Sequence, residues 1–221
     1  MKRLFTAMIA FATWTGAAGA ASQAPVAVVE DVQGKVTGAE FMDYVVPGQV
    51  IKLGVGGKIV IGYMKSCWRE VISGIGTVIV GTDQSAVHLS QFTADKVPCD
   101  SSQAERIGKA VGESAATIVR SLRDDIQPSL VLHGITPIVA VSERGRLVLE
   151  RTDARGERYE VDLTRAPLAR GKFYDLAKAN IALKPGGTYS MKLNSKSTTF
   201  MIDAGATPGA GPVIGRLVML R

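Results

Sequence analysis

The chain has 221 residues, of which 46% are hydrophobic, 6% are aromatic and 24 are glycine, and its formal net charge is +6. This length suits one large or two small domains, and the composition is typical of a β protein whose strands are punctuated by glycine. The charge is mild and spread along the chain, which gives no indication of nucleic acid as a partner.

The first 21 residues are typical of a signal peptide. Lys2 and Arg3 precede an apolar run from Leu4 to Trp14, which is shorter than the ~20 residues needed to span a bilayer. Ala18-Gly19-Ala20 then fits the small-x-small rule of signal peptidase, so we predict cleavage near Ala21. The alternative is a buried amino-terminal helix, but such a helix would alternate polar with apolar positions and carry a cap.

Export predicts a soluble protein of the periplasm or the extracellular space. No cysteine directly follows the apolar run, so a lipid-anchor site is absent, and no later segment has the length of a membrane span. Loss of Lys2 and Arg3 lowers the formal charge from +6 to about +4. That charge supports at most a weak attraction to anionic envelope surfaces.

Residues 25–100 are predicted to form a small β domain. Short β-branched runs alternate with glycine-containing turns, which supply the positive φ angles of tight hairpins. A small barrel or sandwich would close this set of strands. The expected strands are Val26–Val29, Val32–Val36, Phe41–Val46, Val50–Leu53, Lys58–Tyr63, Val71–Ile72, Thr77–Val80 and Val87–Leu89.

Residues 101–127 are predicted to form a connecting helix. Ser102 and Glu105 are placed as a capping box, and Pro128 marks the far limit of the helix. We expect its apolar stripe to pack on its own chain, and a partner-binding helix is the alternative. The stripe consists of Ile107, Val111, Ile118, Leu122 and Ile126, at spacings of four and seven residues.

Residues 128–204 are predicted to form a second β domain, a sandwich of seven strands. Hairpins are expected around Asp153–Gly156 and Asn194–Lys196. A Gly/Pro-rich link then leads to the apolar run Val213–Leu220, within residues 205–221, which could add an edge strand or reach a partner. The expected strands are Leu130–Leu132, Ile138–Val141, Arg146–Arg151, Arg158–Leu163, Ala179–Leu183, Thr188–Leu193 and Thr198–Ile202.

Two parts of the chain resemble known families. Val32–Val36, Pro47–Ile51 and Gly56–Ile61 resemble the turn-and-strand repeats of FecR-like envelope domains, over roughly residues 28 to 90. The Asp-Gly-Ser turn, inner-membrane helix and cytosolic tail of the FecR regulators are missing, so the resemblance implies the β module and not iron-responsive signalling. Leu183–Tyr189 and its neighbouring strands are similar to fibronectin-type or immunoglobulin-like sandwiches, a fold with many functions.

Cys67 and Cys99 are the only cysteines. In an oxidising compartment an even pair usually forms a disulfide, which we predict here. A redox or metal pair is the alternative, but the spacing is not Cys-x-x-Cys, and the two histidines, His88 and His133, lie in different predicted domains.

The sequence carries no recognisable catalytic motif, and we expect neither enzymatic activity nor a cofactor or metal. It has no Gly-x-Ser-x-Gly elbow, and the glycines at Gly54–Gly57 lack the following helix of a phosphate-binding loop. A Ser-His-Asp triad would have to span the two domains. Isolated acids could still pair in space as general acid and base, namely Asp31, Glu40, Asp43, Glu70 and Asp83.

We therefore expect a non-catalytic binding or scaffold protein of the bacterial cell envelope, with an envelope protein or polysaccharide as partner. Sheet edges and apolar patches would make the contacts. One alternative is a carbohydrate-binding or carbohydrate-active protein of the cell wall, in which Tyr44, Tyr63 and Trp68 stack on sugar rings. A secreted effector or adhesin is the other alternative.

Overall fold

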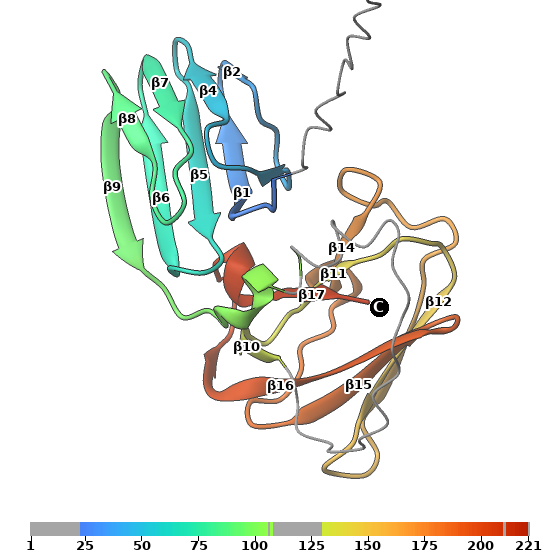
Figure 1. Cartoon of the computed structure of the whole chain (residues 1–221). Helices are drawn as coiled ribbons and strands as arrows, with labels where there is room; N and C mark the ends of the chain where they lie inside the picture. Colours follow the sequence, from blue (N-terminus) through green and yellow to red (C-terminus); the bar gives the residue numbers. More distant parts are fainter. Residues whose placement is uncertain (1–22, 106, 108–129, 210, 221) are drawn as a thin grey trace, which may run out of the picture.

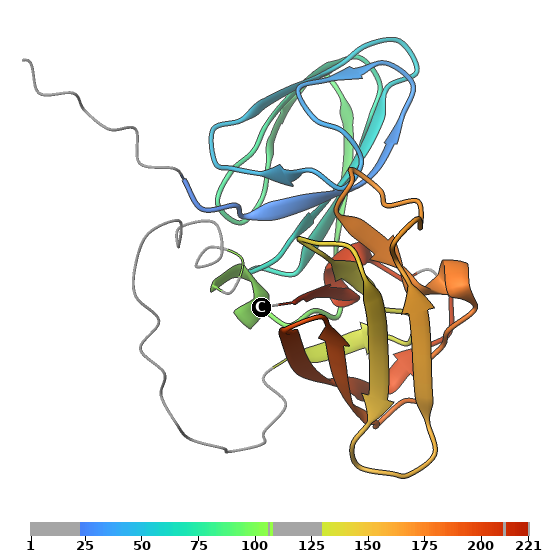
Figure 2. The same ribbon diagram turned by 90° about the vertical axis from the view of Figure 1, so that its right-hand side faces the viewer.

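The computed structural model describes residues 23–105, 107, 130–209 and 211–220. Within these ranges the chain forms two β units, one from each half of the sequence (Figures 1 and 2). The mainly β class predicted from the sequence is confirmed. The predicted signal peptide and most of the predicted helix lie outside the described residues.

The amino-terminal unit consists of two antiparallel sheets in the orders β3-β1-β5-β6-β9 and β2-β4-β7-β8. Alternate side chains of both sheets enclose a core that includes Ile51, Ile59, Ile61 and Ile72. The strands are β1 (Ala27–Gln33), β2 (Val36–Thr37), β3 (Tyr44–Val45), β4 (Val50–Leu53), β5 (Lys58–Tyr63), β6 (Trp68–Ser73), β7 (Gly76–Ile79), β8 (Ala86–His88) and β9 (Gln91–Lys96).

Two strand predictions in this unit were wrong. The strand β1 runs from Ala27 to Gln33 with a register shift between Val29 and Asp31, and the expected strand Val32–Val36 instead crosses the β1–β2 turn at Gly34 and Lys35. The strand β9 was not predicted because Gln91–Lys96 is polar and mostly exposed. It forms because all six of its residues pair with β6.

The carboxyl-terminal unit also consists of two sheets. The larger has the order β10-β16-β15-β12-β13, and the smaller has the order β14-β11-β17. Its core contains Leu147, Leu149, Tyr189 and Phe200. The elements are β10 (Val131–Gly134), β11 (Ile138–Ala140), β12 (Arg146–Arg151), β13 (Arg158–Asp162), β14 (Phe173–Asp175), the 3-10 turn η1 (Leu176–Ala179), β15 (Thr188–Leu193), β16 (Lys196–Thr207), the 3-10 turn η2 (Val213–Gly215) and β17 (Leu217–Met219).

Both predicted hairpins of this unit are confirmed, but Ala179–Leu183 is not a strand. Asp175 caps η1 by accepting a hydrogen bond from the Ala177 amide, and the turn ends at Asn180 in the left-handed conformation. The smaller sheet instead contains β14, which was not predicted. The run Val213–Leu220 contributes η2 and β17, and β17 pairs in parallel with β11 as an edge strand of its own chain.

The helix predicted for residues 101–127 is described only at its start, where Ser102–Glu105 and Ile107 are helical. The expected capping box is wrong, because the buried Ser102 hydroxyl has no hydrogen-bond partner. The Asp100 carboxylate accepts from the Ser102 amide at 2.9 Å in its place. Ile107 is buried where the two units meet.

The two units are joined by a third apolar cluster, built around the buried Ile214 of η2. Glu30 of β1 accepts hydrogen bonds from the Ile214 amide at 3.0 Å and from Arg69 at 2.7 Å. A Cβ at Gly62 would lie 2.6 Å from both Glu30 and Ile214, so only glycine leaves room for this contact. The 3-10 turn η2, close to the carboxyl terminus, therefore links the second unit to the first.

Candidate functional site

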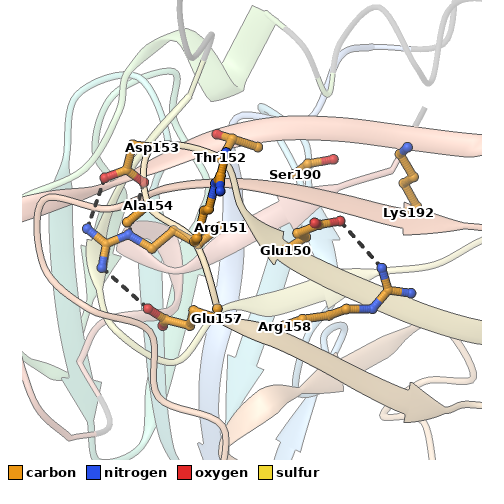
Figure 3. A pocket seen from close by; sticks show the side chains of 11 residues that line it. Glu150, Arg151, Thr152, Asp153, Ala154, Glu157, Arg158, Ser190 and Lys192 are labelled. Atoms are coloured by element: carbon orange, nitrogen blue, oxygen red, sulfur yellow. Dashed lines mark hydrogen bonds and ion pairs between the residues drawn. The ribbon is translucent and has the colours of Figure 1, made fainter.

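A hollow of about 840 Å³ lies at the turn end of the β12–β13 hairpin and over the neighbouring strand β15 (Figure 3). Its side chains are polar or charged, with four basic and three acidic groups and no aromatic ring. The lining residues are Glu150, Arg151, Thr152, Asp153, Ala154, Arg155, Gly156, Glu157, Arg158, Ser190 and Lys192.

The hairpin places these residues through its register. Leu147 and Leu149 of β12 point into the core, so Glu150, which is directly opposite Arg158 on β13 and Ser190 on β15, lies on the outer face. The connecting turn ends at Gly156, whose φ of 90° favours glycine.

The Arg151 side chain binds the two carboxylates at the turn. Its guanidinium donates to both carboxylate oxygens of Asp153, at 3.0 and 2.9 Å, and to Glu157 at 3.3 Å. Figure 3 shows the guanidinium lying between these two carboxylates. The Asp153 carboxylate also accepts from the Thr188 amide, and its hydrogen bond with Arg151 holds the pKa of Asp153 well below its usual range.

Glu157 is the most enclosed carboxylate of the group. It accepts hydrogen bonds from Tyr189 at 2.7 Å and Tyr159 at 3.2 Å, and Lys184 lies 3.5 Å away. Burial raises the pKa of Glu157, but the hydrogen bonds from Tyr189 and Arg151 outweigh it, and the pKa is lowered on balance. Burial and the bond to Glu157 raise the pKa of Tyr189. These groups are fixed in their charge states at neutral pH.

Two cations of the hollow have no carboxylate partner among the described residues. Glu150 pairs with Arg158 at 3.5 Å, while Asp153 and Glu157 are held by Arg151. The side chains left over are Arg155 at the exposed turn and Lys192 on the exposed face of β15. The hollow can therefore accept an anionic group without breaking an existing ion pair.

The charged residues of this hairpin were expected to form a turn, without a binding role. The signal that could have indicated one is the alternation of charge along Arg151, Asp153, Arg155, Glu157 and Arg158. Sequence alone could not show which carboxylate forms an ion pair with which arginine, because this pairing depends on the register of β12, β13 and β15.

The predicted disulfide is confirmed. Cys67 and Cys99 are bonded, with 5.7 Å between their Cα atoms and 32 residues between them in sequence. The bond ties the start of β6 to the segment that follows β9. A disulfide is typical of proteins of an oxidising, extracytoplasmic environment.

The structure places the other candidate residues at different positions in the two units. His88 lies on β8, and His133 on β10 is 3.9 Å from Asp203, so the two histidines stay in separate units. The described residues include no group of three His, Cys, Asp or Glu side chains that could hold a metal ion. Glu40 and Asp43 pair with Arg170 across the junction of the units.

Among the acids considered as a general acid or base, Glu70 is the one that is completely buried. One carboxylate oxygen accepts from the Ser85 amide at 2.9 Å, whereas the other has no hydrogen-bond partner. Burial raises the pKa of Glu70, and burial also raises the pKa of the adjacent Tyr63, whose hydroxyl lies 2.9 Å from that of Ser85, to about 12. No substrate can reach a side chain that is 0% exposed.

The aromatic residues considered for sugar stacking have other contacts. Tyr63 is buried in the core of the first unit, and Tyr44 packs edge-on against Phe173 at the junction, 5.8 Å between ring centroids. Trp68 packs against the same core as Tyr63, with the Lys96 ammonium 5.1 Å from its ring centroid.

Comparison with protein-family models finds no match for this chain, and comparisons with curated proteins and with solved structures find none either. Among the described residues, no helix is long and apolar enough to cross a bilayer.

Proposed function

We propose that this chain is a non-catalytic protein of the bacterial periplasm that binds another envelope protein through an acidic segment of that partner. The proposal rests on one observation, the pattern of ion pairs among the charged side chains that line the hairpin hollow. Every carboxylate in it is engaged by an arginine, while Arg155 and Lys192 are left for an external anion.

A protein partner fits this hollow better than a polysaccharide. Sugar-binding sites commonly offer an aromatic face, and no aromatic residue lines the hollow. Two exposed cations, one at the hairpin turn and one on β15, instead suit the carboxylates of an extended acidic segment. The resemblance of residues 28–90 to FecR-like envelope domains implies a β module of the cell envelope, which is consistent with an envelope protein as partner.

Binding of a fluorescent oligoglutamate peptide tests the proposal. We expect saturable binding to the purified protein that weakens as salt rises, and at least a tenfold loss of affinity in the double variant Arg155→Glu, Lys192→Glu. The matched control is Lys178→Glu, which reverses one exposed charge on η1 of the same unit and should bind like the wild type.

Equal binding of the peptide by the double variant and the wild type would mean that the hollow is not the binding site. Turnover of peptidoglycan fragments or model esters by the purified protein, abolished by changing a single acid or serine, would overturn the non-catalytic assignment.

A further inference from the structure

The far end of the first unit carries three exposed aliphatic side chains at the tips of three turns. They are Leu89, Val55 and Ile75, which are 96%, 79% and 61% exposed. Val55 lies in the β4–β5 turn, Ile75 in the β6–β7 turn and Leu89 in the β8–β9 turn. In Figure 1 these turns are at the upper end of the unit, away from the second unit.

Short contacts show that the turns form one tip. The Gly74 amide donates to the Gly57 carbonyl at 3.0 Å, which joins the β6–β7 turn to the β4–β5 turn. A Cβ at Gly76 would lie 2.2 Å from both the His88 carbonyl and the Ser90 hydroxyl, so the β8–β9 turn packs directly on the β6–β7 turn.

Leu89 stands out within this tip. Its φ of 65° is in the left-handed region, which leucine rarely adopts, and its side chain has almost no contact with the protein. Folding therefore gains nothing from a leucine at this position, where asparagine or glycine would fit the backbone better.

The charges at this tip are all of one sign. The β1–β2 turn adds Lys35, whose side-chain carbons lie along Gly54, and Lys58 follows the β4–β5 turn. The four turns at residues 33–36, 53–58, 73–76 and 88–91 contain no acidic residue. The nearest carboxylate along β1 is Asp31, which accepts a hydrogen bond from Gln33. Neither lysine has an ion-pair partner among the described residues.

We propose that this tip docks on an anionic phospholipid membrane, with Val55, Ile75 and Leu89 inserted below the headgroups and Lys35 and Lys58 at the phosphates. Protruding aliphatic side chains ringed by cations have the composition of interfacial membrane-binding segments. The three side chains come from separate turns instead of a flat face or groove, so they suit a fluid surface that needs no shape complementarity. This site is separate from the hairpin hollow and does not depend on the function proposed for it.

The test is co-sedimentation of the purified protein with vesicles. We expect binding to vesicles of phosphatidylethanolamine mixed with phosphatidylglycerol, and little binding to pure phosphatidylcholine. The variant Lys35→Gln, Lys58→Gln should lower the partition coefficient by about 30-fold if each lysine sits at the surface. The variant Val55→Ser, Ile75→Ser, Leu89→Asn should abolish binding. All three changes are at exposed turn positions, and asparagine suits the left-handed conformation at Leu89.

Matched controls remove an exposed apolar group and a charge elsewhere. Val50→Ser changes a half-exposed residue at the start of β4, and Lys178→Gln changes a lysine on η1. Both controls should bind vesicles like the wild type. Equal binding to neutral and anionic vesicles, no binding at all, or unchanged binding by the tip variants would each overturn the proposal. Concentration-dependent self-association that is lost in the triple variant, without vesicle binding, would assign the tip to a second copy of the chain instead.

Discussion

Single buried or paired carboxylates account for the expected pH response of this protein. Glu70 and Glu157 lie in different units and have opposite pKa shifts, because burial raises the pKa of Glu70, whereas at Glu157 the hydrogen bonds from Tyr189 and Arg151 outweigh burial. The two residues should therefore influence stability with opposite signs.

For Glu70, we predict that Glu70→Gln raises Tm by a few degrees at neutral pH. The raised pKa means that Glu70 favours folding most below its unfolded-state pKa, and that this contribution is lost as pH rises through the folded-state pKa. The gain in the variant should shrink in acid. Thermal unfolding over a pH series measures it, with the exposed Asp95→Asn as control. A variant less stable than the wild type at neutral pH would contradict this reading.

The lowered pKa of Glu157 gives the opposite pattern. Its contribution to folding is present above the unfolded-state pKa and is lost as pH falls through the folded-state pKa. We predict that Glu157→Gln unfolds at lower urea concentration than the wild type at neutral pH, and that the two converge in acid. A constant difference at every pH would mean that packing, and not charge, is responsible.

Two links hold together elements that are distant in sequence. The disulfide closes the 32-residue separation between Cys67 and Cys99, and η2 inserts Ile214 between the two units.

Reduction of the disulfide should lower the free energy of unfolding by ~3–4 kcal/mol, because the unfolded chain gains freedom. Urea unfolding with and without reductant, together with the variant Cys67→Ser, Cys99→Ser, measures this cost. No metal should be released. Two freely reactive thiols in natively folded, non-reduced protein would be inconsistent with the bond.

Ile214→Ala should destabilise the protein by about 2–5 kcal/mol, because the buried side chain leaves a cavity where the units meet. Val50→Ala, at a half-exposed position, is the control, and its effect should be within about 0.5 kcal/mol. If Ile214→Ala has the same small effect, the contact between the units contributes little to folding.

Local patterns predicted the elements that local residues determine. The hairpins around Asp153–Gly156 and Asn194–Lys196, and the apolar strands β4 and β5, follow from turn residues and β-branched runs. The polar strand β9 and the short β14 could not be predicted in this way, because pairing with β6 and β11 determines them. The hollow could not be predicted from local patterns either. Its unpaired cations, Arg155 and Lys192, can be recognised only when the register of β12, β13 and β15 is known.

For the whole protein, we propose that export decides which partners it can meet. The disulfide fits an extracytoplasmic environment, and the predicted signal peptide provides the route. We predict that intact mass of the protein from its native host shows a chain that begins within a few residues of Ala21. Recovery of the full chain with Met1 from the cytosol would remove the periplasmic assignment.

Photo-crosslinking in living cells, with a photoreactive amino acid in place of Ala154 at the hairpin turn, tests whether an acidic segment of an envelope protein docks in the hairpin hollow. We predict a discrete adduct with an envelope protein that disappears when Arg155→Glu and Lys192→Glu are added and persists with Lys178→Glu. No adduct, or the same adduct regardless of the charge at Arg155 and Lys192, would mean that no acidic segment docks in the hollow.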